Sequence, residues 1–482
     1  MNFLEKNVSA SAAHSLDTAL ARMKRAHLDA GPASEQLRRD RIDRTIQLLV
    51  DHHAALADAV SADFGNRSRQ QTLLADVGSS LGALRYNREH LAEWMQPVPQ
   101  AAPFPGVEAH LYHQALGVVG IVSPWNFPIT LAFSPLAAIF AAGNRAMLKP
   151  SELTPRTSAL IAELVAARFD ADEFTVVLGD AAVGAAFTAL PFDHLIFTGS
   201  TRVGRHVMRA AAENLVPVTL ELGGKSPVPV SRSADLRSTA ERLLTVKTFN
   251  AGQICISPDY VFLPHEMVDD FVAAAQHCIG RMYPTLKDNP DFTSIINPAN
   301  FDRLQGHLAD ARDKGARVIE INPAGEDLSD REARKIAPTL ILDATDDMLV
   351  LQEEIFGPIL PIKTYTSFDE VIAYVNSRPK PLAAYYFGSD AAEIQRFTER
   401  TSSGALVVND AMTHVFVEAL PFGGVGASGM GAYHGIHGFR TFSHAKPVLT
   451  QSPGAESNLP MRAPYGDLVQ AVISGQLQGE GT

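Results

Sequence analysis

The segment from Leu116 to Leu222 alternates short apolar runs with helical stretches, and this alternation limits the possible fold more than any other feature. The apolar runs predict strands at Val118–Val122, Ala146–Leu148, Thr175–Leu178, His194–Phe197 and Val218–Leu220. The stretches between them predict helices at about Ile129–Ala142, Pro155–Arg168, Val183–Ala189 and Arg202–Glu213. Strands and helices in this order form βαβ units, so the sequence predicts an α/β fold with a parallel sheet of the nucleotide-binding type.

Polar and glycine residues gather where the predicted strands end. They are Ser123–Asn126, Lys149–Glu152, Gly179–Asp180 and Thr198–Ser200. Ligands of open parallel sheets bind at the carboxyl ends of the strands, so this edge is the predicted ligand site.

The rest of the chain adds a helical start and a second α/β region. Apolar spacing predicts helices from Ser15 to about Met95, and the proline-rich segment Gln96–Gly106 interrupts them. From Ser226 to about Leu420 further strands are predicted. They are Tyr260–Leu263, Thr339–Leu342 and Leu406–Val408. A chain of 482 residues is longer than one hydrophobic core usually supports, so two or three domains are expected.

Charge and composition exclude several classes of function. The net charge of −12 disfavours a nucleic-acid or anionic-membrane partner. The most apolar stretch, Phe127–Gly143, is too short and too interrupted by prolines to span a bilayer. Met1–Lys6 is not followed by the apolar region of a signal peptide, and two cysteines make no disulfide framework. These features predict a cytoplasmic protein. The scattered histidines and the absence of HExxH and CxxC motifs predict no metal site.

Cys255 and Glu221 are the candidate chemical groups. Cys255 lies among small residues in Asn250–Ser257, and Glu221 begins the glycine turn Glu221–Lys225. A thiol is a strong nucleophile, and a carboxylate can activate water. Beside a cofactor-binding sheet, this pair predicts covalent carbonyl chemistry. An isolated cysteine is more often inert, so the other motifs decide between the two interpretations.

Three further motifs each allow two interpretations. Phe197–Gly204 runs from a strand into a helix and suits a diphosphate, or is a plain turn capped by Ser200. Lys149–Glu152 either binds the hydroxyls of a ribose or is a solvated turn. Pro124–Pro128 either presents the Asn126 amide to an oxyanion or is a packed aromatic loop. The GxGxxG at Gly424–Gly429 follows no clear strand and is interpreted as a loop.

In this order along the chain, these motifs resemble those of the aldehyde dehydrogenase superfamily, over roughly Leu116–Ala445. The matching segments are the Asn126 loop, Lys149–Glu152, Phe197–Ser200, Glu221–Lys225, Cys255, Glu353–Pro358 and Pro421–Gly424. Gly252–Tyr260, Gly429–Gly435 and Thr441–His444 resemble the class 3 branch, as does the short N-terminus. Asp63–Ser68 is similar to bacterial members described as coniferyl aldehyde dehydrogenases.

The resemblance implies three domains. Residues 1–102 and 116–225 would form the dinucleotide-binding domain, and residues 226–420 the catalytic domain. Residues 103–115 and 421–460 would form a bridging arm for oligomerisation, with a homodimer favoured.

The resemblance also implies the residue roles. Cys255 would form a thioester, Asn126 and the Cys255 amide would bind the oxyanion, and Glu221 would activate water. Cofactor contacts would come from Trp125, Lys149, Glu152, Gly199, Ser200, Gly204, Leu222, Glu354 and Phe356. The cofactor would be NAD, with NADP as the alternative, because the Glu152 carboxylate would repel a 2′-phosphate. A thiolate near neutral pH would also require local dipoles that lower the pKa of Cys255.

The substrate is left open by the sequence. Trp125, Phe127, Phe416, Phe422 and Tyr433 could line an aromatic tunnel for an aromatic or cinnamyl aldehyde such as coniferyl aldehyde, or could be ordinary core. The alternative activity is that of a cofactor-independent cysteine hydrolase or acyltransferase. Such an enzyme would keep Cys255 but would not need Lys149, Glu152 and Ser200. A structural relative without activity should have lost Cys255, Glu221 or Asn126.

Overall fold

The computed structural model describes residues 10–455 and 457–477. Its largest sheet has six strands in the order β15-β7-β6-β3-β4-β5, all parallel except β15. The strands are β3 (Val118–Val122), β4 (Arg145–Lys149), β5 (Phe174–Val176), β6 (His194–Thr198), β7 (Val218–Glu221) and β15 (Gly429–Met430). The predicted parallel sheet is therefore confirmed. The segment Met1–Lys6, from which we expect no signal peptide, lies outside the described residues.

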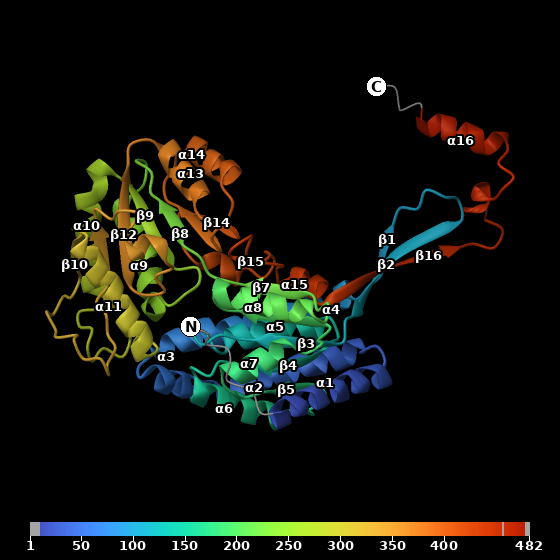
Figure 1. The fold of residues 1–482 in the computed structure, drawn as a ribbon, viewed down its shortest axis with the longest axis horizontal. Coiled ribbons are helices and arrows are strands. Elements are labelled where there is room, and N and C mark those ends of the chain that lie inside the picture. The colour runs from blue at the N-terminus through green and yellow to red at the C-terminus, as the bar shows by residue number, and fades with distance from the viewer. Residues whose placement is uncertain (1–9, 456, 478–482) are drawn as a thin grey trace.

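Helices cover both faces of this sheet because successive strand side chains point to opposite faces. Val118, Met147 and Leu195 pack against one helical layer, while Val119, Leu148 and Ile196 pack against the other. The first layer holds α1 (Ala10–Ala30), α7 (Ala181–Thr188) and α8 (Thr201–Ala212). The second holds α5 (Thr130–Ala141), α6 (Pro155–Ala166), α2 (Glu35–Phe64) and α4 (Ser79–Trp94). Figure 1 shows these helices around the sheet.

A second sheet carries the Cys255 region. Its strand order is β10-β11-β12-β9-β8, with β10 antiparallel to its neighbour. The strands are β8 (Ser226–Pro229), β9 (Pro258–Pro264), β10 (Arg317–Glu320), β11 (Thr339–Leu342) and β12 (Ile359–Tyr365). The accompanying elements are α9 (Leu236–Thr248), α10 (Val268–Met282), α11 (Pro298–Asp313), α12 (Leu349–Gln352), α13 (Phe368–Ser377), α14 (Ala391–Arg400) and the pair β13 (Ala383–Tyr386) and β14 (Ala405–Val408).

A third, antiparallel sheet projects from the body of the molecule (Figure 1). It consists of β1 (Val98–Gln100), β2 (Val107–Ala115) and β16 (Ser443–Gln451), and α16 (Asp467–Leu477) lies beyond it. The segment before β16 does not join this third sheet. Instead, β15 pairs with β7, and α15 (Gly435–Thr441) packs on α4 and α5. The division of the chain into three domains stays a prediction.

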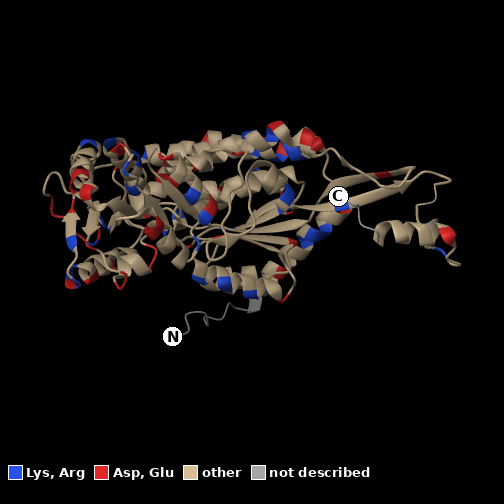
Figure 2. Cartoon of the chain, turned by 90° about the horizontal axis from the view of Figure 1, so that it is seen from above, with Lys and Arg blue, Asp and Glu red and all other residues tan. Residues whose placement is uncertain are grey.

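The surface agrees with the mixed charge of the sequence. Figure 2 shows basic and acidic residues interspersed along the body. No helix in the described part of the chain combines the length and the apolar character that a membrane crossing requires.

Candidate active site

Cys255 lies in a tight connection between α9 and β9. A short 3-10 helix, η2 (Phe249–Gly252), contains Asn250 and Ala251 with φ of 51° at both positions. Such backbone conformations cost free energy in residues other than glycine, and they cluster at functional sites. Gly252 has φ of 71°, and any side chain there would overlap the carbonyl group of Gly357. The chain therefore turns sharply just before it presents the partly exposed Cys255.

The buried side chain of Gln253 fixes this connection. Its amide donates to the carbonyls of Asn250 (2.9 Å) and Ser294 (3.1 Å), and its Oε1 accepts from the amide of Ile296 (2.9 Å). The backbone amide of Asn250 donates to Gln71 Oε1 (2.9 Å). Two separate segments, at Gln71 and at Ser294–Ile296, therefore hold the backbone that carries Cys255.

Asn126 lies directly against the same connection. Its side-chain amide donates to the Gln253 carbonyl (3.1 Å), and the residue is buried. Its own carbonyl accepts from Asn250 Nδ2 (3.1 Å) and from Arg67 Nη1 (2.7 Å). The structure thus brings the predicted oxyanion donor next to the predicted nucleophile segment.

Glu221 is the last residue of β7, in register with Thr198 of β6. Its side chain is buried, and neither carboxylate oxygen has a hydrogen-bond partner among the described residues. Burial without partners raises the pKa of Glu221 well above its usual value. An unpartnered buried carboxyl group is free to bind water or a reacting group.

Glu354 is the second buried carboxyl group. Any side chain at Gly223 would overlap the Glu354 carboxylate. The glycine turn after Glu221 therefore leaves the space that the Glu354 side chain occupies. Its Oε1 has no partner within the described residues. Burial first, and then the charge of Asp259, raise the pKa of Glu354 to about 8.

The charges of both carboxylates raise the pKa of the Cys255 thiol. Burial, the charge of Glu354 and the charge of Glu221, in that order, raise the pKa of Cys255 to about 12. The expectation of a lowered thiol pKa is not met by the protein alone, because burial and two acidic groups together outweigh the hydrogen bonds of the nearby backbone amides. A positive charge near Glu354 and Cys255 would reverse this balance.

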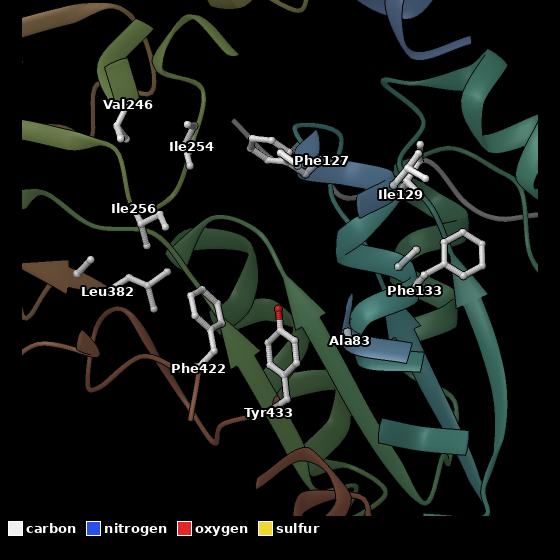
Figure 3. Close-up of a cluster of buried hydrophobic side chains, with 14 of the residues drawn as sticks. Ala83, Phe127, Ile129, Phe133, Val246, Ile254, Ile256, Leu382, Phe422 and Tyr433 are labelled. Atoms are coloured by element: carbon white, nitrogen blue, oxygen red, sulfur yellow. The ribbon is translucent and has the colours of Figure 1, made fainter. Parts of the chain in front are cut away.

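The cavity in front of Cys255 is mainly apolar. Four predicted tunnel residues line it together with Cys255, namely Phe127, Phe416, Phe422 and Tyr433. Figure 3 shows Ile254 and Ile256 from the Cys255 connection and Phe422 and Tyr433 from the C-terminal part of the chain. Trp125 is not in this lining; it packs between Phe64 and Phe356, at ring distances of 6.0 and 5.4 Å.

The predicted cofactor residues meet at the strand ends of the six-stranded sheet. Ser200 caps α8, with its hydroxyl accepting from the Val203 amide (3.4 Å), and Lys149 Nζ lies 3.3 Å from Glu152 Oε2 at the end of β4. A Cβ at Gly204 would come within 2.7 Å of the Leu222 side chain, and one at Gly199 within 2.6 Å of the Phe197 ring. These glycines let α8 and its leading turn lie close to the sheet.

This edge of the sheet fits a dinucleotide. The start of α8 offers free backbone amides to a diphosphate. Large apolar side chains are exposed beside it, namely Leu153, Leu178 and Val203, and they would pack against a flat base. Glu354 adds an unpartnered carboxylate oxygen for a ribose hydroxyl.

Sequence reasoning assigns no role to four residues that contact the Asn126 loop. Arg67, Asp76, Asn250 and Gln253 surround the Asn126 loop, although Arg67 belongs to a segment noted only for its subfamily resemblance.

Gly424–Gly429 forms a loop that returns to β15, with the Val425 amide donating to Ser428 Oγ (2.9 Å). Within residues 10–455 and 457–477, no group of three or more His, Cys, Asp or Glu side chains is arranged to hold a metal ion.

Comparison with known sequences agrees with this geometry. A model described as "Aldehyde dehydrogenase family" matches residues 5–448. The chain is 65% identical over 480 residues to a coniferyl aldehyde dehydrogenase of Pseudomonas sp. strain HR199, covering 100% of both proteins. It is 39% identical over 441 residues to mouse aldehyde dehydrogenase family 3 member B2, covering 89% of this chain and 90% of that protein.

Solved structures show the same architecture. A substrate-bound Staphylococcus aureus AldH aligns with a TM-score of 0.90 at 34% identity, over 95% of this chain and 99% of that one. A P. syringae indole-3-acetaldehyde dehydrogenase mutant in complex with NAD+ and IAA aligns with a TM-score of 0.83 at 25% identity, over 91% and 89% of the two chains. The fold therefore has close counterparts among these solved structures.

Proposed function

Since the chain belongs to the aldehyde dehydrogenase family, we propose that its physiological substrate is a cinnamyl aldehyde, coniferyl aldehyde above all. The protein is an NAD(P)-dependent aldehyde dehydrogenase of the class 3-like branch and oxidises an aldehyde to the carboxylic acid. The observation that carries the choice of substrate is the apolar cavity with aromatic walls that ends on Cys255. A flat conjugated ring would pack against Phe127 and Phe422.

In the proposed mechanism the Cys255 sulfur attacks the aldehyde carbon. The thiol must first lose its proton to solvent, a step that burial and the charges of Glu354 and Glu221 oppose in the protein alone. The resulting oxyanion accepts hydrogen bonds from the Asn126 amide and from the Cys255 backbone N–H. Asn126 Nδ2 has two protons, and only one is used in its bond to the Gln253 carbonyl.

Loss of a hydride from this adduct gives a thioester on Cys255. NAD(P), when bound, supplies the acceptor for that hydride. Glu221 then takes a proton from water, the water oxygen attacks the thioester carbon, and the carboxylic acid leaves as the sulfur is released. Neither Glu221 oxygen has a partner among the described residues, which supports this role because the carboxylate can accept from water.

Lys149 and Glu152 would hold the adenosine ribose, and Ser200, Gly199 and the start of α8 would hold the diphosphate. Gly204 and Leu222 would keep α8 close to the sheet. Glu354 would bind the nicotinamide ribose, with Trp125 and Phe356 packed at that end. The charge of Glu152 favours NAD over a cofactor with a 2′-phosphate.

We also infer a homodimer in the cytoplasm. The β2–β16 arm carries exposed apolar side chains such as Tyr112 and Leu449, and α16 beyond it exposes Leu468, Val472 and Ile473. Surfaces of this kind suit an interface between two copies of the chain. Sedimentation of the purified protein measures the oligomeric state.

The test of the proposed function is a substrate screen at 340 nm with NAD. The value of kcat/KM should be highest for cinnamyl aldehydes, lower for benzaldehydes and lowest for short aliphatic aldehydes. Cys255→Ala should abolish NADH formation and still bind NAD. Product formation without NAD would favour the cofactor-independent hydrolase or acyltransferase, and a preference for short aliphatic aldehydes would contradict the proposed substrate.

A further inference from the structure

Arg67 and Asp76 form an ion pair with no solvent exposure of either side chain, directly beneath the Asn126 loop. Arg67 Nη2 donates to Asp76 Oδ2 (2.8 Å), and Arg67 Nη1 donates to the backbone carbonyl of Asn126 (2.7 Å). One guanidinium group therefore links the acid to the backbone of the residue proposed to bind the oxyanion.

Asp76 holds the other end of the same loop. Its Oδ1 accepts from the backbone amides of Ile129 (3.2 Å) and Thr130 (3.0 Å), where α5 begins. The Arg67 guanidinium carbon lies 4.7 Å from the centre of the Phe127 ring and 5.1 Å from that of Phe64. The pair thus contacts the loop through the backbone on both sides of Pro128 and through the Phe127 ring.

The local fold places Asp76 for this contact. It lies in η1 (Thr72–Gly78), a π-helical segment between α3 (Arg69–Gln71) and α4. Segments of this kind are rare and frequently occur at functional sites. Ala75 of the same segment and Ser79 just after it line the cavity in front of Cys255, so the pair also adjoins the cavity wall.

We propose that Arg67 and Asp76 are positioning residues, which hold the Asn126 amide at the place where the oxyanion forms. This inference deepens the proposed function and rests on the oxyanion role given there to Asn126. Stability alone is a poor reason for such a pair, because apolar replacements of buried ion pairs are often as stable. Fixing a loop by three directional hydrogen bonds to its backbone is a task that apolar side chains cannot perform.

The test is a kinetic cycle between this pair and Asn126. Arg67→Lys and Asp76→Asn should each lower kcat by about 10²-fold, the usual effect of a misplaced catalytic group, with NAD affinity unchanged. In an Asn126→Ala background the same changes should lower kcat by less than about 2-fold, since there is no amide left to misplace. Guanidinium ion added to Arg67→Ala should restore part of the lost kcat.

The matched control is Arg41→Lys. Arg41 is also buried and paired, with its Nε 3.1 Å from Glu173 Oε1, but its hydrogen bonds go to Glu173 and to the Asn144 carbonyl and not to the Asn126 loop. It should change the melting temperature by a similar amount and leave kcat within about 2-fold. This comparison separates loss of stability from loss of positioning.

Each outcome decides between the two proposals. If Asn126→Ala keeps full turnover, its oxyanion role fails. If Asn126→Ala is slow but Arg67→Lys lowers kcat equally in both backgrounds, only the positioning inference fails. If Arg67→Lys, Asp76→Asn and Arg67→Ala all fail to fold, the pair belongs to folding and the inference is overturned.

Discussion

The side-chain amide of Asn126 donates a hydrogen bond to the backbone carbonyl of Gln253, 3.1 Å away and two residues before Cys255. This bond joins the loop after β3 to the connection before β9, so one contact spans the two large sheets at the nucleophile. It also fixes the orientation of the amide before any substrate arrives, which is the preorganisation that oxyanion stabilisation requires.

Asn126→Ala should therefore lower kcat by about 10²-fold or more with little loss of NAD affinity. Steady-state kinetics and equilibrium binding of NAD measure the two quantities. Asn126→Asp keeps the size and one oxygen but removes the N–H donor, and it should be as slow as Asn126→Ala. Weak NAD binding with normal turnover would instead place Asn126 in the cofactor site.

The raised pKa of Cys255 predicts a poorly reactive thiol in the enzyme without cofactor. With a pKa of about 12, alkylation by iodoacetamide at pH 7.5 should be at least about 10²-fold slower than for a free thiol, and should speed up as the pH rises. NAD+ should accelerate the reaction, because a positive ring offsets Glu354 and Glu221. Mass spectrometry follows Cys255 against Cys278, whose alkylation NAD+ should not change.

Glu221→Gln should separate hydride transfer from hydrolysis. The change keeps the size of the side chain and removes the base, so the steady-state rate should fall by about 10²–10⁴. A burst of NADH should survive in stopped-flow absorbance, because the hydride leaves before water attacks. Because burial raises the pKa of Glu221, the hydrolysis rate of the wild type should rise with pH as this acid ionises. Disappearance of the burst would assign Glu221 to activation of Cys255.

Glu354 and Glu353 offer a matched pair of substitutions. Glu354 is buried against Gly223, whereas Glu353 points outward and lies 3.4 Å from His307 Nε2. Glu354→Gln should raise the KM for NAD and, by removing the charge that raises the thiol pKa more than that of Glu221, speed alkylation of Cys255 at pH 7.5. Glu353→Gln should do neither. Equal effects of the two variants would show that neither carboxylate acts on the site directly.

Much of this fold followed from local patterns. The strands from Val118 to Leu220 are short, apolar and separated by helices. The spacing of apolar residues and the turn residues between them were therefore enough to predict their positions. Glu221 and Cys255 stood out because few residue types carry covalent chemistry. Long-range partners had no such signal: the contact of Arg67 with Asn126 joins residues 59 apart in the chain.

The electrostatics also depended on the folded structure. The thiol pKa was expected to be lowered, but Glu354 and Glu221 come from two separate segments and both act on Cys255. The sequence leaves Trp125 open as either tunnel wall or ordinary core, and in the structure it packs on Phe64 and Phe356. Side-chain direction in a loop follows tertiary packing and cannot be derived from spacing.

Glu418 is an acidic group in the mainly apolar cavity that Cys255 also lines. Its Oε2 has no partner among the described residues, and neither has Nδ1 of the buried His434 beside it in the cavity wall. Burial raises the pKa of Glu418 to about 7, although a hydrogen bond from the Gly435 amide opposes this. His434 also has φ of 82°, a conformation that non-glycine residues rarely adopt.

These unpartnered atoms predict that the enzyme selects aldehydes with a phenolic hydroxyl, because such a hydroxyl could donate to Glu418. The measured quantity is the ratio of kcat/KM for 4-hydroxycinnamaldehyde to that for cinnamaldehyde, which differ only in this group. In the wild type the ratio should exceed one and should rise between pH 6 and pH 8, as Glu418 ionises and becomes a stronger acceptor. Glu418→Gln should lower the ratio by about 10-fold, the worth of one charge-assisted hydrogen bond, and remove its pH dependence. An unchanged ratio in Glu418→Gln would show that the phenol lies elsewhere in the cavity.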